Sequence, residues 1–312
     1  MELRQLRYLV AIAEHGSFSK AAEKVFVAQS ALSQQIALLE AEVGTPLFDR
    51  SRKGAQLSEA GQRFLPHAVS ILRQVQEAAR SARQDGSAPE GKVVFGLPHS
   101  VSNALALPLL RAVRARWPGV QLELTEELTG HLTRQLRSGH LHMAVLFDDG
   151  HLAGLRQARL LYERLSLIAP ATGTPAQRNT NGGISLRHAL QQPLVLPAQP
   201  HGVRPLIEAA ARSAGLPPPV VEADISSISI LRTTLLAGMG RTLLPVMPLL
   251  PEIQAGLLRA TPVNRLDRAL AVCSSAQIPR SPACQAVAEL AVALMQRMVR
   301  EGAWQGARLV GR

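Results

Sequence analysis

The first 60 residues carry apolar positions at the spacing of three short helices. One helical face runs from Leu6 to Ala13, and Gly16 is placed to end that helix. Ser17 is a favourable N-cap for a second helix, and the spacing predicts a third over residues 29–43. The segment LFDRSRKGAQL then predicts a hairpin that turns at Arg-Lys-Gly. These elements have the proportions of a helix-turn-helix followed by a wing.

A longer amphipathic helix is predicted over residues 58–84. Two series of apolar residues spaced seven apart form an a/d seam of nearly three heptads, which is typical of a helix that pairs with another. Pro66 removes one backbone hydrogen bond and predicts a bend in the first third of this helix. The segment DGSAPEG then predicts a linker. The residues expected to dimerise are Leu65, Ala68, Leu72, Val75, Ala79 and Ala82.

Beyond residue 92, short apolar runs alternate with helical patterns, which indicates an α/β fold. Strands are expected in VVFGLP, VQLELTE, HMAVLF, LSLIAP, LVLP and VVEAD. Residues 93–126 and 193–224 each read as a strand, a Pro/His loop, a helix, a Pro/Gly break and a second strand that ends in an acid. This internal echo favours two similar lobes.

The third predicted helix has two different faces. Its apolar stripe consists of Leu32, Ile36 and Leu39. Its small, polar, uncharged face consists of Gln29, Ser30, Ala31, Ser33, Gln34 and Ala37. A helix that enters the major groove needs such a face, because amides bond adenine, hydroxyls bond either base and methyl groups contact thymine. An ordinary solvated helix would look similar alone, but the preceding helices favour DNA reading.

The formal net charge of +11 lies in an unexpected place. Residues 1–90 hold 11 basic and 10 acidic side chains, of the 34 basic and 23 acidic ones in the chain. The other 23 basic and 13 acidic side chains lie in residues 91–312. DNA recognition is therefore expected to rest on the neutral helix face and the wing cations rather than on the charge surplus. Scattered arginines also fit a codon bias on solvated faces. If the second half holds a ligand, the surplus favours an anion.

The sequence indicates a cytoplasmic protein with no membrane partner. The N-terminus has neither the apolar core nor the cleavage site of a signal peptide, and no window reaches the roughly 18 apolar residues of a membrane span. Cys273 and Cys284 are too few for a disulfide framework.

The segments SFSKAAEKVFVAQSALSQQIALLE, GTPLFDR and LSEAG together resemble the LysR-type transcriptional regulators, with the nearest likeness to the nitrogen assimilation control regulators. The resemblance continues more loosely through LTEELTGHLTRQLRSGHLHMAVLF and AGMGRTLLPVMP. It implies an α/β chain with a two-lobed effector domain similar to periplasmic binding proteins. The implied parts are a winged helix-turn-helix at 1–60, a linker helix and hinge at 61–91, an effector domain at 92–302 (lobe one 92–162 and 268–302, lobe two 163–267) and a tail at 303–312.

The resemblance also implies which residues approach DNA. Gln34 stands where a basic residue is frequent in the family, and an amide there favours adenine over guanine. The candidate DNA contacts are Ser17, Ser19, Ala28, Gln29, Ser30, Ser33, Gln34, Arg50, Arg52 and Lys53.

A ligand site is expected where strands end and helices begin in the two lobes. Helix N-termini favour anions, and Arg204 is placed to add a carboxylate clamp. The candidate effector contacts are Pro98, His99, Ser100, Ser102, Asn103, Thr129, Gln199, His201, Gly202 and Arg204. Two alternatives stay open: the serines and Asn103 cap helices only, or the cleft is empty, since regulators of the nitrogen assimilation type are thought to act without a co-inducer.

Other chemistry is set aside. GSAPEGK lacks the Ser or Thr and the strand-before-helix order of a phosphate-binding loop. The histidines at 131, 140, 142 and 151 are spaced too loosely to predict a metal site, and reduced thiols are favoured over a redox pair. No cofactor, metal or catalytic residue is predicted.

The predicted function is sequence-specific regulation of transcription. Homodimers that pair into tetramers are expected to bind interrupted palindromes in double-stranded DNA and to act on RNA polymerase, in response to a small anionic effector. A cytoplasmic solute-binding or sensor protein, whose helical front end binds protein instead of DNA, is the alternative, and an enzyme ranks third.

Overall fold

The computed structural model describes residues 1–51, 54–82, 88–148, 152–172, 182–198 and 203–311. The chain forms two compact units, one made mainly by residues 1–87 and the other mainly by the remainder. Among the described residues, no helix is long and apolar enough to cross a membrane.

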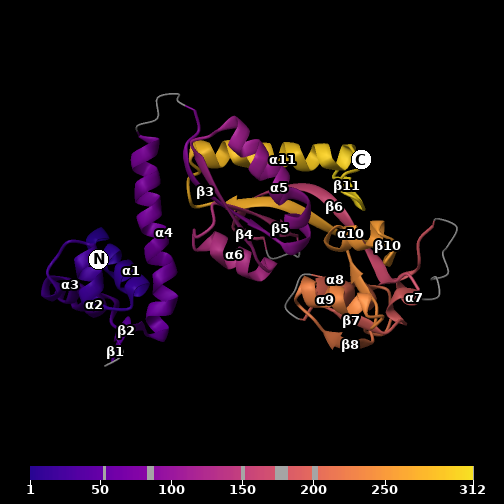
Figure 1. The fold of residues 1–312 in the computed structure, drawn as a ribbon, viewed down its shortest axis with the longest axis horizontal. Helices are drawn as coiled ribbons and strands as arrows, with labels where there is room; N and C mark the ends of the chain where they lie inside the picture. The colour runs from indigo at the N-terminus through magenta and orange to yellow at the C-terminus, as the bar shows by residue number, and fades with distance from the viewer. Residues whose placement is uncertain (52–53, 83–87, 149–151, 173–181, 199–202, 312) are drawn as a thin grey trace. The chain divides into compact units, whose positions relative to one another are not determined.

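Three short helices and a hairpin open the N-terminal unit (Figure 1). They are α1 (Leu3–His15), α2 (Phe18–Lys24), α3 (Gln29–Val43) and the antiparallel strands β1 (Phe48–Ser51) and β2 (Gly54–Leu57). The end signals lie where the sequence predicts them: Gly16 and Gly44 end α1 and α3 with left-handed backbones, and Ser17 caps α2. The predicted winged helix-turn-helix is confirmed.

The wing is tied to the helices by polar contacts. The Glu40 carboxylate accepts from the backbone N–H of Leu47 at 2.7 Å, and the Ser58 hydroxyl donates to the Pro46 carbonyl at 2.7 Å. A Cβ at Gly61 would lie 2.0 Å from the Leu47 carbonyl oxygen, so this close approach requires glycine. The segments GTPLFDR and LSEAG therefore hold the hairpin in place.

One long helix, α4 (Glu59–Ser81), follows the wing and runs through Pro66 without interruption. Ala68 of this helix is fully buried in the core that α1, α2 and α3 form.

A mixed sheet forms the centre of the second unit. Its strands are β3 (Gly91–Leu97), β4 (Val120–Glu126), β5 (Met143–Phe147), β6 (Leu155–Pro170), β9 (Thr242–Leu244), β10 (Leu258–Ser275) and β11 (Ala307–Leu309). Their order is β11-β6-β10-β5-β3-β4, with β9 also paired to β6. β3 runs parallel to β4 and β5, and the other pairs are antiparallel.

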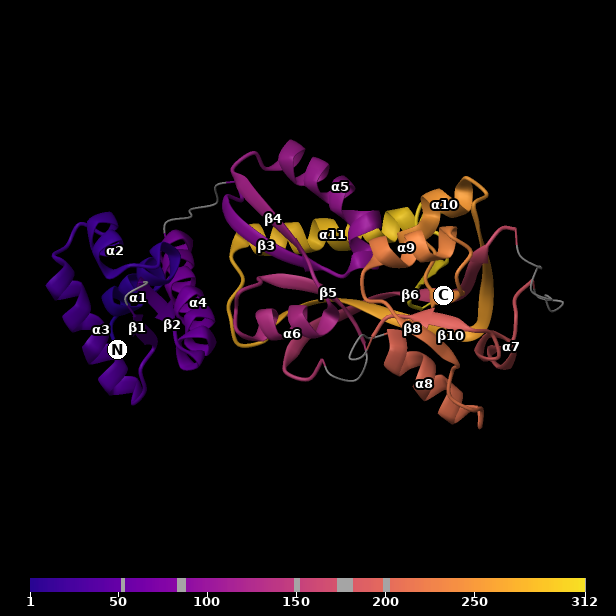
Figure 2. The same ribbon diagram turned by 60° about the horizontal axis from the view of Figure 1, so that its bottom comes forward.

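Alternating side chains of the sheet enter two different cores. Val93 and Phe95 of β3 pack with α5 (His99–Arg116) and α11 (Pro282–Arg300), whereas Val94 packs with α6 (Thr129–Arg137). The helices accordingly cover both faces of this sheet (Figure 2). The strand prediction for β3 is confirmed, and the continuous burial of residues 93–97 explains why that part of the strand has no polar side chain.

A second lobe has its own core. Its elements, apart from the ends of β6, β9 and β10, are α7 (Leu186–Leu190), β7 (Leu194–Leu196), α8 (Val203–Ser213), β8 (Val221–Asp224), α9 (Ile228–Leu236), the 3₁₀ helix η1 (Met247–Leu249) and α10 (Leu250–Gln254). The long strands β6 and β10 serve both lobes. On β6, Leu161 lies in the core of the first lobe and Leu165 in that of the second. On β10, Leu270 lies in the core of the first lobe and Leu266 in that of the second.

Candidate functional sites

The exposed face of α3 is small, polar and uncharged. Gln29, Ser30 and Gln34 are exposed, while the opposite stripe, with Leu32 and Ile36, is fully buried. The predicted division of this helix into two faces is therefore present in the structure. An exposed face of amides and hydroxyls at the leading end of a helix has the chemistry to contact base edges in the major groove.

The other candidate DNA contacts have varied surroundings. Ser17 accepts from the Lys20 backbone N–H at 3.4 Å, so its hydroxyl caps α2. Ser19 and Ala28 are exposed and Ser33 is half-buried. Arg50 stands in strand β1 of the wing, and Arg52 and Lys53 lie outside the described residues.

The heptad seam of α4 divides into two halves. Leu65 and Leu72 are half-buried against the core that holds Ala68, so this part of the seam packs within its own chain. Val75, Ala79 and Ala82 are exposed. Only the second half of the predicted seam is therefore accessible to a partner.

A small pocket of about 70 Å³ lies between the two lobes of the second unit. Most of its lining is apolar, and the polar groups are few. The lining residues are Pro98, His99, Ser100, Glu127, Leu128, Thr129, Phe147, Pro197, Val203, Ser226, Ile228, Leu244, Pro245, Pro248 and Arg268.

Four helices begin at this pocket. His99 starts α5, Thr129 starts α6, Val203 starts α8 and Ile228 starts α9, and all four residues line it. A helix N-terminus presents backbone N–H groups and the positive end of the helix dipole, although in α9 the Ser227 hydroxyl already accepts from the Ile230 N–H at 3.4 Å. Such an arrangement favours a ligand with a negative charge or with hydrogen-bond acceptors.

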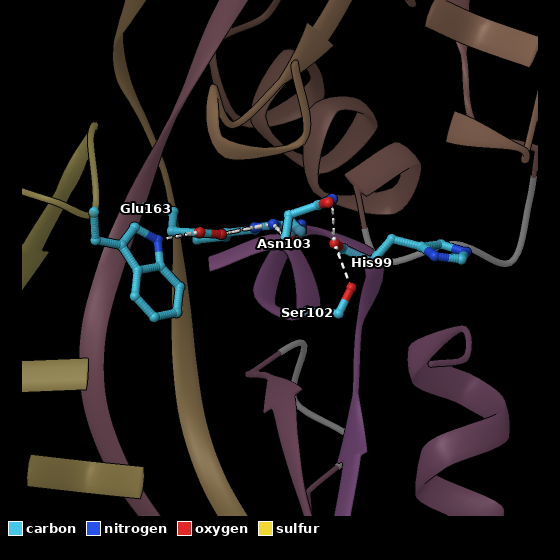
Figure 3. Close-up of polar contacts among 7 residues, drawn as sticks. His99, Ser102, Asn103 and Glu163 are labelled. Carbon is cyan, nitrogen blue, oxygen red and sulfur yellow. Dashed lines mark hydrogen bonds and ion pairs between the residues drawn. The ribbon is translucent and has the colours of Figure 1, made fainter. Parts of the chain in front are cut away.

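Arg268 of β10, which lines the pocket, forms a buried ion pair. Its guanidinium donates to the Glu163 carboxylate at 2.6 and 2.9 Å and to the Ser100 hydroxyl at 2.5 Å. The Trp304 indole N–H donates to the other Glu163 oxygen at 2.9 Å (Figure 3). The Phe147 ring lies 3.7 Å from the Arg268 guanidinium carbon, measured to the ring centroid. One network thus joins β6, β10, α5 and the segment after α11.

The pair sits where the two lobes meet. Glu163 and Arg268 are direct cross-strand partners on β6 and β10, and the neighbouring residues on each strand belong to different cores. Their side chains are 1% and 5% exposed. Burial lowers the pKa of Arg268 and Glu163 opposes that change; the guanidinium stays charged because its ordinary pKa is far above neutral. Charge neutralisation by Glu163 keeps a buried cation at the pocket wall.

The structure brings together only part of the predicted effector site. Pro98, His99, Ser100 and Thr129 line the pocket, whereas Gln199, His201 and Gly202 lie outside the described residues. Ser102 and Asn103 donate to the His99 carbonyl at 3.0 Å each (Figure 3), and neither lines the pocket. Their contacts stabilise the first turn of α5.

Arg204 has other partners. Its guanidinium donates to Glu208 at 2.7 Å and to Asp224 at 3.0 Å, and the residue is not among those that line the pocket. The cation at the pocket wall is Arg268 instead. Arg268 was not among the predicted site residues, because it follows Asp267 and Glu163 precedes Arg164, so neither charge stands out in the sequence.

The two cysteines are buried and form no disulfide. Burial, with a contribution from Asp148, raises the pKa of Cys273 to about 12. We expect Cys273 and Cys284 of the native protein to react with a thiol reagent at pH 8 orders of magnitude more slowly than a free thiol, because access to both is blocked and thiolate is scarce at Cys273. Ellman's reagent, added before and after unfolding in urea, measures this. Rapid labelling of the native chain would contradict it.

No cluster of three metal-ligating side chains occurs among the described residues.

Comparisons with known proteins match both units. Residues 3–62 match the family described as bacterial regulatory helix-turn-helix protein, lysR family, and residues 86–296 match the LysR substrate binding domain. The nitrogen assimilation regulatory protein nac of Klebsiella aerogenes is 33% identical over 300 residues, which cover 95% of this chain and 96% of that protein. Its Escherichia coli counterpart is 32% identical over 96% of this chain and 97% of its own.

Solved structures share the fold. A full-length OxyR variant from Pseudomonas aeruginosa has a TM-score of 0.69 at 23% identity, covering 94% of each chain. Full-length CbnR, solved in complex with its target DNA, has a TM-score of 0.65 at 20% identity, covering 94% of this chain and 99% of CbnR. The family matches and the relatives over almost the whole chain lead to one conclusion: this chain belongs to the LysR family of DNA-binding transcriptional regulators and carries an effector-binding domain.

Proposed function

We propose that this regulator reads its promoter sites through the exposed face of α3, with Gln29, Ser30, Ser33 and Gln34 toward the bases and the wing toward the phosphates. The observation that carries the proposal is the exposed amide and hydroxyl face opposite a fully buried stripe. Binding of the purified chain to duplexes with an interrupted palindrome, measured at several salt concentrations, tests it.

The proposed active form is a homodimer that pairs into a tetramer, acts in the cytoplasm on RNA polymerase and catalyses no reaction. The exposed half of the α4 seam, Val75, Ala79 and Ala82, supports pairing with a second copy. Two copies place two α3 helices on one duplex, which matches palindromic half-sites. The domain boundaries proposed from the sequence, 1–60, 61–91 and 92–302, place these roles on separate parts of the chain.

We also propose that the pocket between the lobes binds a small anionic effector. Four helix N-termini and the Arg268 guanidinium line this pocket, and its remaining walls are mostly apolar. The ligand class that fits is a small carboxylate with an apolar body. Its anionic group would lie near Ser100 and Thr129, whose hydroxyls are at the starts of α5 and α6.

A screen of small carboxylates by thermal shift tests the effector proposal. A carboxylate at about 100 times its dissociation constant is expected to stabilise the folded chain by about 2.7 kcal/mol. Thr129→Val keeps the shape of the side chain but removes the hydroxyl, and we expect it to weaken that carboxylate about tenfold, the loss of one hydrogen bond to a charged group.

Thr233→Val is the matched control, because Thr233 is an exposed α9 residue outside the pocket lining and its hydroxyl donates to the Ser229 carbonyl of the same helix at 3.1 Å. If no carboxylate shifts the melting temperature, or if both valine variants respond equally, the anion proposal is wrong. A chain that binds DNA with full specificity and responds to no carboxylate would support the empty-cleft alternative.

A further inference from the structure

Phe26, in the turn between α2 and α3, is an exposed aromatic residue that the fold does not use. Its side chain is 93% exposed, the highest value among the large hydrophobic residues described. Val25 and Val27 on either side are partly buried against the core of the unit, and Phe26 is not part of that packing. A single exposed apolar residue is ordinary on a protein surface, so exposure alone assigns no role.

The backbone of Phe26 supplies a second observation. Its φ is +57°, in the left-handed region that bulky residues avoid. The Val27 N–H bonds the Ala22 carbonyl at 3.0 Å and the Phe26 N–H bonds the Glu23 carbonyl at 3.3 Å. This is the Schellman arrangement at the end of α2, with Phe26 at the position that glycine or asparagine normally fills. Phe26 therefore destabilises the turn and gains no burial in return.

The position of Phe26 connects it to the DNA-reading face. The α3 helix starts three residues after Phe26. Ala28, which precedes the helix, and Gln29 and Ser30, which begin it, are exposed. The exposed ring is thus continuous in sequence with the leading end of the helix that is placed toward bases. Because this face is uncharged, an apolar contact can contribute to its affinity for DNA.

We propose that Phe26 is a further DNA-contacting residue, whose ring packs on an apolar part of the duplex at the edge of the major groove, namely a thymine methyl group or a deoxyribose. The proposal rests on the proposed role of α3. Burial of part of the ring against DNA lowers the free energy of the complex and so offsets the cost of the strained turn.

Three variants test the proposal. Phe26→Asn and Phe26→Gly suit the left-handed backbone, and both are expected to raise the urea midpoint of the full chain's N-terminal transition. Both are also expected to bind a specific duplex roughly tenfold more weakly per subunit, because the apolar contact is lost. Phe26→Leu keeps an apolar side chain and is expected to retain most of the affinity. Opposite signs for stability and binding are the signature of this role.

Salt dependence and base analogues complete the design. An apolar contact releases no counterions, so the slope of log affinity against log salt is expected to be unchanged in Phe26→Asn. Arg50→Ala removes a cation of the wing that is proposed to face the phosphates, and it is expected to reduce the magnitude of that slope by about one. Replacing thymines with uracils removes the methyl groups: an affinity loss seen with the native chain and absent in Phe26→Asn assigns the methyl, and equal losses assign the sugar.

Phe26→Asn binding within twofold of the native chain overturns the proposal, and so does a loss of transcription activation without a loss of affinity, which would make Phe26 a protein contact. Failure of the native chain to bind DNA specifically, or full binding by Gln34→Ala, would instead contradict the role of α3.

Discussion

Glu163→Gln is expected to lower the free energy of unfolding of the second unit by about 3–5 kcal/mol, because it leaves the Arg268 charge buried without its counter-charge. Both side chains of the pair are almost fully buried, and Trp304 and Ser100 bond to the same network. Glutamine has the size of glutamate, so loss of charge rather than loss of packing produces the effect.

Urea unfolding followed by tryptophan fluorescence measures this change, because Trp117 and Trp304 are the only tryptophans and both lie in the second unit. Glu123→Gln is the matched control. Glu123 pairs with Lys92 at 2.6 Å, but both side chains are nearly half exposed, so a loss below about 1 kcal/mol is expected.

A second comparison separates charge from position. The double variant Glu163→Leu with Arg268→Met removes both charges and is expected to recover much of the lost stability, since apolar replacements of buried pairs are often neutral. Equal losses for Glu163→Gln and Glu123→Gln would show that the pair contributes no more than an exposed one.

The sequence was most informative where local signals determine structure. In α3, the 3.6-residue period separates the buried stripe from the exposed face, and Gly44 ends the helix. The six predicted strands all overlap observed strands, because each is a short run rich in apolar residues and bounded by breakers.

Contacts between distant residues were not predictable in the same way. β10 was missed as an 18-residue strand because its pairing with β6 shifts register between Pro262 and Asp267, and Arg265 has a positive φ, which interrupts any simple alternation. The tail predicted at 303–312 contains Trp304 and β11, whose stability comes from pairing with β6. Glu163 and Arg268 lie 105 positions apart, and only the sheet register makes them partners.

The effector site shows the same limit. The starts of α5 and α6 were located from strand ends, so Ser100 and Thr129 were found. Which arginine faces the pocket depends on the acidic residues that lie near each one. Glu208 and Asp224 form ion pairs with Arg204, whereas Arg268 reaches the pocket from a strand whose sequence does not indicate a binding site.

Gln34→Ala is expected to weaken binding to a specific palindromic duplex by about 2–6 kcal/mol, because a bidentate amide contact contributes about 1–3 kcal/mol and a dimer makes it twice. Gln34 is exposed on the face opposite the buried stripe of α3. Non-specific binding, which depends on phosphates, is expected to be unchanged, so the variant should lose discrimination rather than affinity for DNA in general.

The neighbouring glutamine provides an unusually close control. Gln35 is half-buried and accepts from the Gln5 side-chain amide at 3.3 Å, so Gln35→Ala is expected to lower the stability of the N-terminal unit by about 1–3 kcal/mol without altering base preference. Selection from randomised duplexes measures that preference. The native chain is expected to recover adenine at the base facing residue 34, and Gln34→Arg to recover guanine. If the native chain selects guanine there, or if Gln34→Ala discriminates as well as Gln35→Ala, then Gln34 does not read a base and the polar face of α3 serves another purpose.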